Sequence, residues 1–211
     1  MGNVNIDFLV DDLKPVRFVK SSSAFILTAI TTMAIAVLVA VTIGTRPDIA
    51  AANPAAIVLA RSGILLLLGC VTLRELTISA RPEIGSQSNG WKWIVVLAGV
   101  IPLITFTSWL RTQPTNFSIE ISSSSMRCLG ISISAAFAIA TPLTLWLRRG
   151  ATVTINRSAW LVGLTAGSLG AFCYNLNCPS QTIGYACIWY LLSVVLSTIA
   201  GRLMVPHFIR W

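Results

Sequence analysis

The chain has 211 residues, of which 55% are hydrophobic and only 10% are Asp, Glu, Lys or Arg. Soluble globular domains carry roughly 25% charged residues, and a soluble protein with so few charges would expose large apolar patches. The composition therefore excludes an ordinary soluble domain and predicts an all-α integral membrane protein. In a membrane protein, Lys and Arg gather in the loops on the cytoplasmic side, and we expect this to account for the net charge of +8.

The first 22 residues are predicted to form a tail outside the membrane that contains a short amphipathic helix. Asn5 is a suitable N-cap, and Pro15 ends the helix. One face is formed by apolar residues at helical spacing, namely Ile6, Leu9, Val10 and Leu13. Helices that lie on a membrane usually carry Lys and Arg on the polar face, whereas this tail carries three aspartates. A helix that docks into a groove of a protein partner fits better, although an interfacial helix on the inner leaflet is the alternative.

Six membrane-spanning helices are predicted after this tail. A helix needs about 20 residues to cross the hydrocarbon core, and the charge-free runs are 21–45, 93–110, 128–147 and 158–201. The last run is about twice that length and is interrupted by a turn-forming segment rich in Asn, Pro and Gly, residues 175–184. A further span contains Arg61 and Arg74 close enough to its ends for their side chains to reach the headgroups. The predicted spans are 23–43, 57–79, 93–110, 126–147, 159–176 and 184–204.

The orientation follows from the loops and tails between these spans. The side that holds both termini carries nine Lys or Arg residues, at positions 14, 17, 20, 81, 92, 148, 149, 157 and 210. The opposite loops carry only Arg46 and Arg111. Positive residues stay cytoplasmic, so the predicted fold is a six-helix transmembrane bundle with both termini in the cytoplasm. Residues 1–22 form the cytoplasmic tail, 23–205 the membrane domain and 206–211 a second cytoplasmic tail. Contact with anionic lipid then explains the basic charge, which gives no support for nucleic-acid binding.

Several short motifs resemble one known family. The tail segment Leu9-Val-Asp-Asp-Leu-Lys-Pro-Val-Arg17 is similar to the amino-terminal signature of the NrsF family of bacterial membrane anti-sigma factors. Further similar motifs, in chain order, are Arg46-Pro-Asp48, Asn177-Cys-Pro179, Trp189-Tyr190, Gly201-Arg202 and Arg210-Trp211. The resemblance runs nearly from end to end and includes six spans with a cytoplasmic amino terminus. One departure is the carboxyl-terminal tail, which is less basic than is usual in the family.

The resemblance implies that the chain is an anti-sigma factor in the bacterial inner membrane, with no enzymatic activity. It would sequester an extracytoplasmic-function (ECF) sigma factor until a stress signal releases it. The implied partner-binding residues are Leu9, Val10, Asp11, Asp12, Leu13, Pro15, Val16 and Arg17. We expect the apolar members to fill a groove and the aspartates to face basic surface on the partner.

Five cysteines supply a candidate signal input: Cys70, Cys128, Cys173, Cys178 and Cys187. Cys128 begins the fourth span and Cys178 lies in the turn after the fifth, so the predicted topology places both at the oxidising periplasmic face. Two thiols there can form a disulfide or transiently share a soft metal ion; no resident metal or cofactor is expected. The resemblance implies that this pair senses an oxidative or heavy-metal signal. Cys173 and Cys187 are competitors near the same face, and Cys70 is expected to be a buried, inert thiol.

Other features are predicted to serve packing. The small residues of the segment Gly163-Leu-Thr-Ala-Gly167, followed by Gly170, favour close helix contact, and Arg74 and Glu75 are expected to pair at headgroup level. The alternative function is a small six-span transporter or channel, which should place ionisable groups at mid-membrane. An intramembrane enzyme is disfavoured because the chain has one histidine, His207, and no paired carboxylates.

Overall fold

Six α-helices make up the computed structural model, which describes residues 20–44, 56–80, 90–111, 123–150, 154–177 and 183–209. These ranges contain no strand. The helices are α2 (Ser21–Ile43), α4 (Ala56–Ser79), α5 (Gly90–Arg111), α6 (Ser123–Arg148), α7 (Ile155–Asn175) and α8 (Ile183–Ile209). The all-α class and the number of helices agree with the sequence prediction. The amphipathic tail up to residue 19 and Cys178 lie outside the described residues, so the division into tail and membrane domain stays a prediction.

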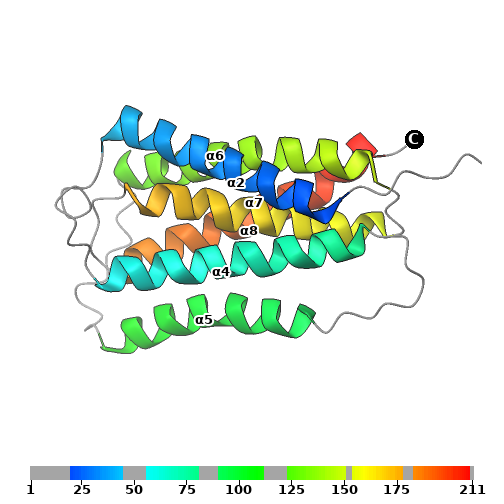
Figure 1. Cartoon of the computed structure of the whole chain (residues 1–211). Coiled ribbons are helices and arrows are strands. Elements are labelled where there is room, and N and C mark those ends of the chain that lie inside the picture. Colours follow the sequence, from blue (N-terminus) through cyan, green and yellow to red (C-terminus); the bar gives the residue numbers. More distant parts are fainter. Residues whose placement is uncertain are drawn as a thin grey trace, which may run out of the picture.

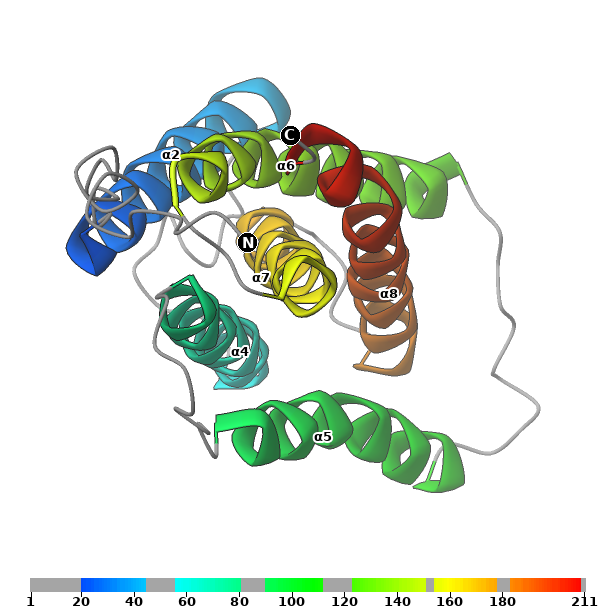
Figure 2. The same ribbon diagram turned by 90° about the vertical axis from the view of Figure 1, so that its right-hand side faces the viewer.

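The helices form an elongated bundle in which α7 occupies the centre. They run side by side along one axis (Figure 1), and the end-on view shows α2, α4, α6 and α8 arranged around α7 (Figure 2). Helix α5 lies on the outside, where it packs against α4 and α8. Because 15 of the 21 residues of α7 are buried, whereas α2 buries only 3 of its 23, α7 forms the buried centre against which α2, α4, α6 and α8 pack.

The central position of α7 explains a difference in apolar character among the six helices. Four described segments are long and apolar enough to cross a membrane, Ser21–Ile43, Val58–Ser79, Met126–Arg148 and Ile188–Ile209, and Gly90–Val100 is a shorter apolar helix. Helix α7 is not among them, because it is rich in Gly, Ser and Thr. A helix enclosed by other helices does not need apolar side chains on every face, since its surroundings are protein rather than lipid.

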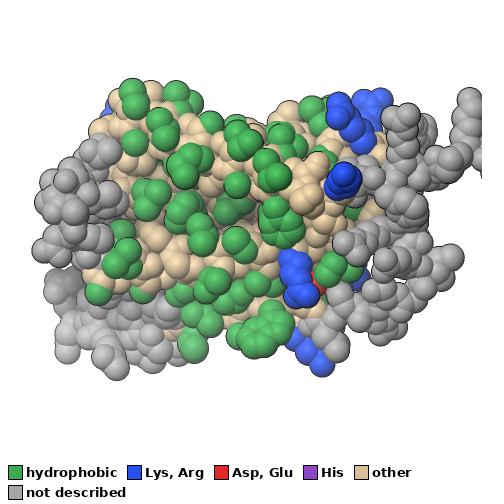
Figure 3. Space-filling view, in the orientation of Figure 1, with side chains coloured by type: hydrophobic (Ala, Val, Ile, Leu, Met, Phe, Trp, Pro, Cys, Tyr) green, Lys and Arg blue, Asp and Glu red, His purple; other side chains and the backbone are tan. Residues whose placement is uncertain are grey.

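The outer surface of the bundle is apolar along its length and basic at one end. Large hydrophobic side chains are exposed on α2, for example Ile30, Met33 and Val41 at 63, 67 and 78%. Lys and Arg side chains gather at the end where α2 begins and α8 finishes (Figure 3). An apolar belt of this kind is compatible with hydrocarbon surroundings.

Glycines allow the backbones of α6, α7 and α8 to approach closely. A Cβ atom added to Gly201 of α8 would lie 2.6 Å from the Cα atom of Gly163, and one added to Gly163 would lie 2.7 Å from the carbonyl oxygen of Ser197. On the other side of α7, a Cβ atom at Gly170 would lie 2.7 Å from the carbonyl oxygen of Ser132 in α6. The predicted packing role of the small residues in α7 is therefore confirmed.

We expect Gly170→Ala to destabilise the bundle by roughly 1–3 kcal/mol, because the added methyl group meets backbone atoms of α6 that cannot move independently. In a domain of this size that change lowers the melting temperature by several degrees. The matched control is Gly130→Ala in α6, where nothing lies within 4 Å of the added Cβ atom. Thermal unfolding in detergent should show a loss for the first variant only, and equal melting temperatures would contradict this packing.

Candidate functional site

A seam of polar contacts joins α4 to the central helix α7. Four side-chain pairs form it, one residue of each pair on either helix. They are Ser62 with Asn175 at 2.7 Å, Thr72 with Thr165 at 2.9 Å, Glu75 with Arg157 at 3.5 Å, and Ser79 with Ser158 at 3.2 Å. We call this set the polar seam. Hydrogen bonds between helices fix their register, so α4 and α7 are held at both ends and in the middle.

Three of the four pairs in the polar seam share one register, and the long side chain of Arg157 reaches Glu75 from outside that register. Between Ser62 and Thr72 the chain advances by ten residues, and between their partners Asn175 and Thr165 it returns by ten. From Thr72 to Ser79 the advance is seven, and Ser158 lies seven residues before Thr165. Steps of ten and seven residues correspond to about three and two helical turns, which returns each side chain to the same face. The two helices are thus antiparallel partners in one register at these three pairs.

One end of the seam contains a buried acidic group. The side chain of Glu75 is only 2% exposed, and its Oε2 atom lies 3.5 Å from Nη2 of Arg157, which is 47% exposed. Helix α5 begins at the same point, and Gly90 leaves the space that the carboxylate occupies, since a Cβ atom there would lie 1.8 Å from Oε1. Helices α4, α5 and α7 therefore meet at Glu75.

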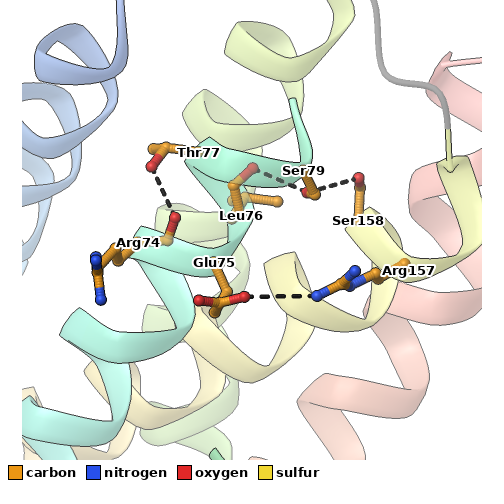
Figure 4. A network of polar contacts seen from close by, with 7 residues as sticks. All are labelled: Arg74, Glu75, Leu76, Thr77, Ser79, Arg157 and Ser158. Atoms are coloured by element: carbon orange, nitrogen blue, oxygen red, sulfur yellow. Dashed lines mark hydrogen bonds and ion pairs between the residues drawn. The ribbon is translucent and has the colours of Figure 1, made fainter. Parts of the chain in front are cut away.

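The partner of Glu75 was wrongly expected to be Arg74. Figure 4 shows the two side chains leaving α4 in different directions, with Glu75 turned toward Arg157. Adjacent residues on a helix point about 100° apart, so a buried Glu75 requires an outward Arg74. The ion pair therefore links two helices instead of lying within one.

Removing the cation of this pair should cost more than neutralising the anion. We expect Arg157→Met to destabilise the protein by roughly 1–3 kcal/mol, because the buried carboxylate of Glu75 loses a charged partner. Glu75→Gln should cost less, since the remaining guanidinium is half-exposed and reaches water. Arg149→Met, an exposed arginine nearby in sequence, is the control. Melting temperatures of the three variants test this order, and an equal effect of Arg149→Met would contradict it.

The opposite end of the seam is formed by amides and a buried arginine. Asn175 donates through Nδ2 to Ser62 and, at 3.5 Å, to the carbonyl oxygen of Val58. Asn177 donates back to the carbonyl oxygen of Cys173 at 3.2 Å, which closes the end of α7. Arg61 is 8% exposed, and its Nε and Nη2 atoms have no hydrogen-bond partner among the described residues. Arg61 was expected to reach the headgroups, and the structure instead buries it between helices.

The cysteines lie in different surroundings. Cys128 is 3% exposed and belongs to a hydrophobic cluster with Tyr174 of α7 and Trp189 and Tyr190 of α8. Cys178 is outside the described residues, as is the side chain of Cys187. The structure therefore places Cys128 beside the ends of α7 and α8 but does not test its pairing.

The other two described thiols, Cys70 and Cys173, differ in exposure. Cys173 is buried, and its Sγ donates to the carbonyl oxygen of Thr32 at 3.5 Å, joining α7 to α2. This contact favours the packing interpretation of Cys173. The expectation that Cys70 is buried was wrong, because its side chain is exposed on the outer face of α4. An apolar thiol is tolerated there if the surroundings are lipid.

The sequence did contain a signal for the polar seam. Polar residues recur in α4 at positions 62, 72 and 79, and in α7 at 158, 165 and 175, with the same steps of ten and seven in reverse order. Matching intervals in two helices predict an antiparallel polar interface. Each helix alone suggests only isolated Ser, Thr and Asn side chains.

The chain matches the model of a known protein family. The model of the family NrsF, described as negative regulator of sigma F, matches residues 9–211. No curated protein and no solved structure matches the chain. The matched range includes all six helices and begins at Leu9, the first residue of the tail motif.

Proposed function

The chain belongs to the NrsF family of negative regulators of sigma F, and from this premise we propose that it is a membrane-bound anti-sigma factor for an ECF sigma factor. The family match is the observation that supports a regulatory role, and it implies a sigma factor as partner. In the proposal, the protein lies in the bacterial inner membrane, captures the sigma factor through its cytoplasmic tail and releases it on a periplasmic thiol-reactive signal.

The distribution of charge supports the proposed orientation. The end of the bundle where α2 begins and α8 finishes carries seven of the Lys and Arg residues in the described ranges: Lys20, Arg74, Lys92, Arg148, Arg149, Arg157 and Arg202. The other end carries Arg61, Arg111 and Arg127. By the positive-inside tendency the first end is cytoplasmic. The tail that precedes Ser21 then starts on the side of the membrane where sigma factors act.

The composition of the tail supports a role in capture. Leu9, Val10 and Leu13 provide an apolar face, while Asp11 and Asp12 provide negative charge. Sigma factors need basic surface to approach DNA, whose phosphates dominate its binding of proteins. An acidic segment on that surface would compete with DNA and speed association. Pro15, Val16 and Arg17 complete the proposed partner-binding segment.

The polar seam supplies a physical connection for release. Helix α7 carries Asn175 and the turn with Cys178 at one end and Arg157 at the other, and the seam fixes it to α4 in between. Oxidation or soft-metal capture at Cys128 and Cys178 would pull the start of α6 toward that turn. A signal crosses the bundle only if the helices have two discrete arrangements. A tenfold loss of sigma-factor affinity requires a coupling free energy of about 1.4 kcal/mol, which a disulfide can supply.

The transporter alternative receives less support from the same residues. In the described parts of α2, α6 and α7, no Asp, Glu, Lys or Arg lies in the middle of a helix. The Glu75–Arg157 pair lies within about one turn of the helix ends, at the basic end of the bundle. Transport pathways place ionisable groups near mid-membrane, so this pair is more suited to fixing helices.

Affinity purification of the intact chain from detergent-solubilised membranes of its source cells tests the proposed function. We expect mass spectrometry to identify one ECF sigma factor enriched with the wild-type chain and absent from a purification with the tail deleted. Enrichment of no sigma factor by a correctly inserted chain would contradict the proposal. Enrichment of a sigma factor by the tail-deleted chain would retain the regulatory role and overturn the role of the tail.

A further inference from the structure

An apolar groove lies between α6 and α8 on the surface of the bundle. Its volume is about 220 Å³, and its floor includes Ala166 of the central helix α7. The walls are formed largely by small and apolar side chains, among them Ala136, Ala140 and Leu145 of α6 and Ala200, Met204 and Phe208 of α8. Figure 2 shows α6 and α8 on neighbouring sides of α7, and the lining residues of the groove come from these three helices.

The length of the groove matches one leaflet of a membrane. Ala136 and Arg148 mark its extent along α6. Their separation of twelve residues corresponds to about 18 Å at 1.5 Å per residue. One leaflet contributes about half of the 30 Å hydrocarbon core. Since Arg148 is at the basic end of the bundle, the groove runs from mid-membrane to the surface of the proposed cytoplasmic leaflet.

The polar groups along the groove favour an anionic head and an apolar chain. Thr141 and Thr144 donate to carbonyl oxygens of their own helix, at 2.9 and 2.8 Å. Ser197 of α8 also lines the groove, and its buried hydroxyl has no hydrogen-bond partner among the described residues, so one neutral donor is free beside the apolar chain. Arg148 lines the groove at its outer end, is exposed, and has no carboxylate partner in the described part of the chain. Among the described residues, no Asp or Glu lines the groove. A ligand that complements it has a negative charge at one end and a hydrocarbon chain below.

We propose that this groove binds one acyl chain of an anionic phospholipid of the cytoplasmic leaflet, with the phosphate at Arg148. The inference rests on the membrane placement in the proposed function. Basic sites between transmembrane helices on the cytoplasmic side are suited to anionic headgroups. A lipid held there contacts α6, α7 and α8 together and stabilises the crossing at which Gly201 meets Gly163.

Native mass spectrometry of the detergent-purified protein tests the site, with phosphatidylglycerol and phosphatidylethanolamine of identical acyl chains as probes. We expect phosphatidylglycerol to be retained in preference. Arg148→Gln should weaken its binding about fivefold, the contribution of one arginine near a membrane surface. The matched control is Arg149→Gln, the exposed neighbour that does not line the groove, which should change binding less than about twofold.

Filling the groove provides an independent test. Ala140→Phe should remove the preference for phosphatidylglycerol, and Ala200→Phe should do the same from the facing helix. Ala138→Phe, an exposed position two residues away on α6 and outside the groove, is the control. Equal retention by the filled and control variants would overturn the proposal. A dimer that is lost only in the filled variants would overturn it in favour of an interface between two copies.

The same variants separate this inference from the proposed function. If lipid binding is unchanged by every substitution while the sigma factor is still captured, only the lipid site is wrong. If no variant, including wild type, captures a sigma factor, the proposed function fails whatever lipid is bound.

Discussion

Replacing Leu9 and Leu13 together by alanine is expected to lower the affinity for the sigma factor by about two orders of magnitude. Both side chains lie on the apolar face predicted for the tail. A leucine side chain that is fully buried contributes roughly 1.5 kcal/mol or more, and the loss of two such side chains corresponds to a factor of about 100 in affinity. Quantitative co-purification with the sigma factor, at equal amounts of membrane-inserted protein, measures the effect.

The control removes the same chemistry from another surface. Leu66 and Leu67 of α4 are 40 and 53% exposed on the outside of the bundle. The double variant Leu66→Ala/Leu67→Ala therefore deletes two leucine side chains far along the chain from the tail. We expect it to capture the sigma factor as wild type does. If the tail variant also captures normally, the partner is held by another segment.

Serine at Cys128 or at Cys178 is expected to leave capture intact and to abolish release under thiol-reactive stress. A serine hydroxyl forms neither a disulfide nor a stable soft-metal bond, so the bundle would lack the event that shifts it. The measurement is expression of a sigma-dependent reporter gene before and after treatment of the cells with an oxidant or a heavy-metal salt. Reporter expression should stay low in both variants, whereas in wild type it should rise at least about tenfold. A coupling free energy of about 1.4 kcal/mol between the thiol event and sigma-factor binding corresponds to a change of this size.

Two further cysteines serve as controls for different reasons. Cys70→Ser should respond as wild type because its side chain is on the outer face of α4. Cys173→Ser should also respond, since a serine hydroxyl can still donate to the carbonyl oxygen of Thr32. Normal release by both Cys128→Ser and Cys178→Ser would show that these thiols only pack. Loss of release in Cys173→Ser alone would move the sensor to the α2–α7 contact.

The helices were predictable because a helix that crosses a membrane needs a charge-free run of about 20 residues, and the chain contains such runs. The division of the longest run near residues 175–184 separated α7 from α8 correctly, because Asn, Pro and Gly cluster there. The small residues of α7 predicted close packing because a glycine has no Cβ atom to hold a neighbouring helix away. In the structure, no Cβ atom would fit between Gly163 and Gly201. Helix length, the composition of the segment between two helices and the spacing of small residues are all properties of residues close together in the chain, so the sequence shows them directly.

Partners across helices were not predictable in this way. Glu75 was assigned to Arg74 because they are adjacent, whereas burial of the carboxylate selected Arg157, 82 residues away in the chain. Similarly, Cys70 was expected to be buried since its neighbours are apolar, but in a helix with an apolar outer face that composition does not distinguish inside from outside. The polar seam was visible only when the intervals in α4 and α7 were compared with each other.

The central claim is that a thiol event at one end of the bundle weakens capture of the sigma factor at the other. The most direct measurement is the affinity of the purified sigma factor for the intact chain in lipid nanodiscs, first with thiols reduced and then after stoichiometric mercuric ion or oxidant. We predict tight binding in the reduced state and at least about tenfold weaker binding afterwards, with no change in a Cys128→Ser/Cys178→Ser variant. An affinity that is the same in both states, or a change that persists in the double variant, would contradict the account.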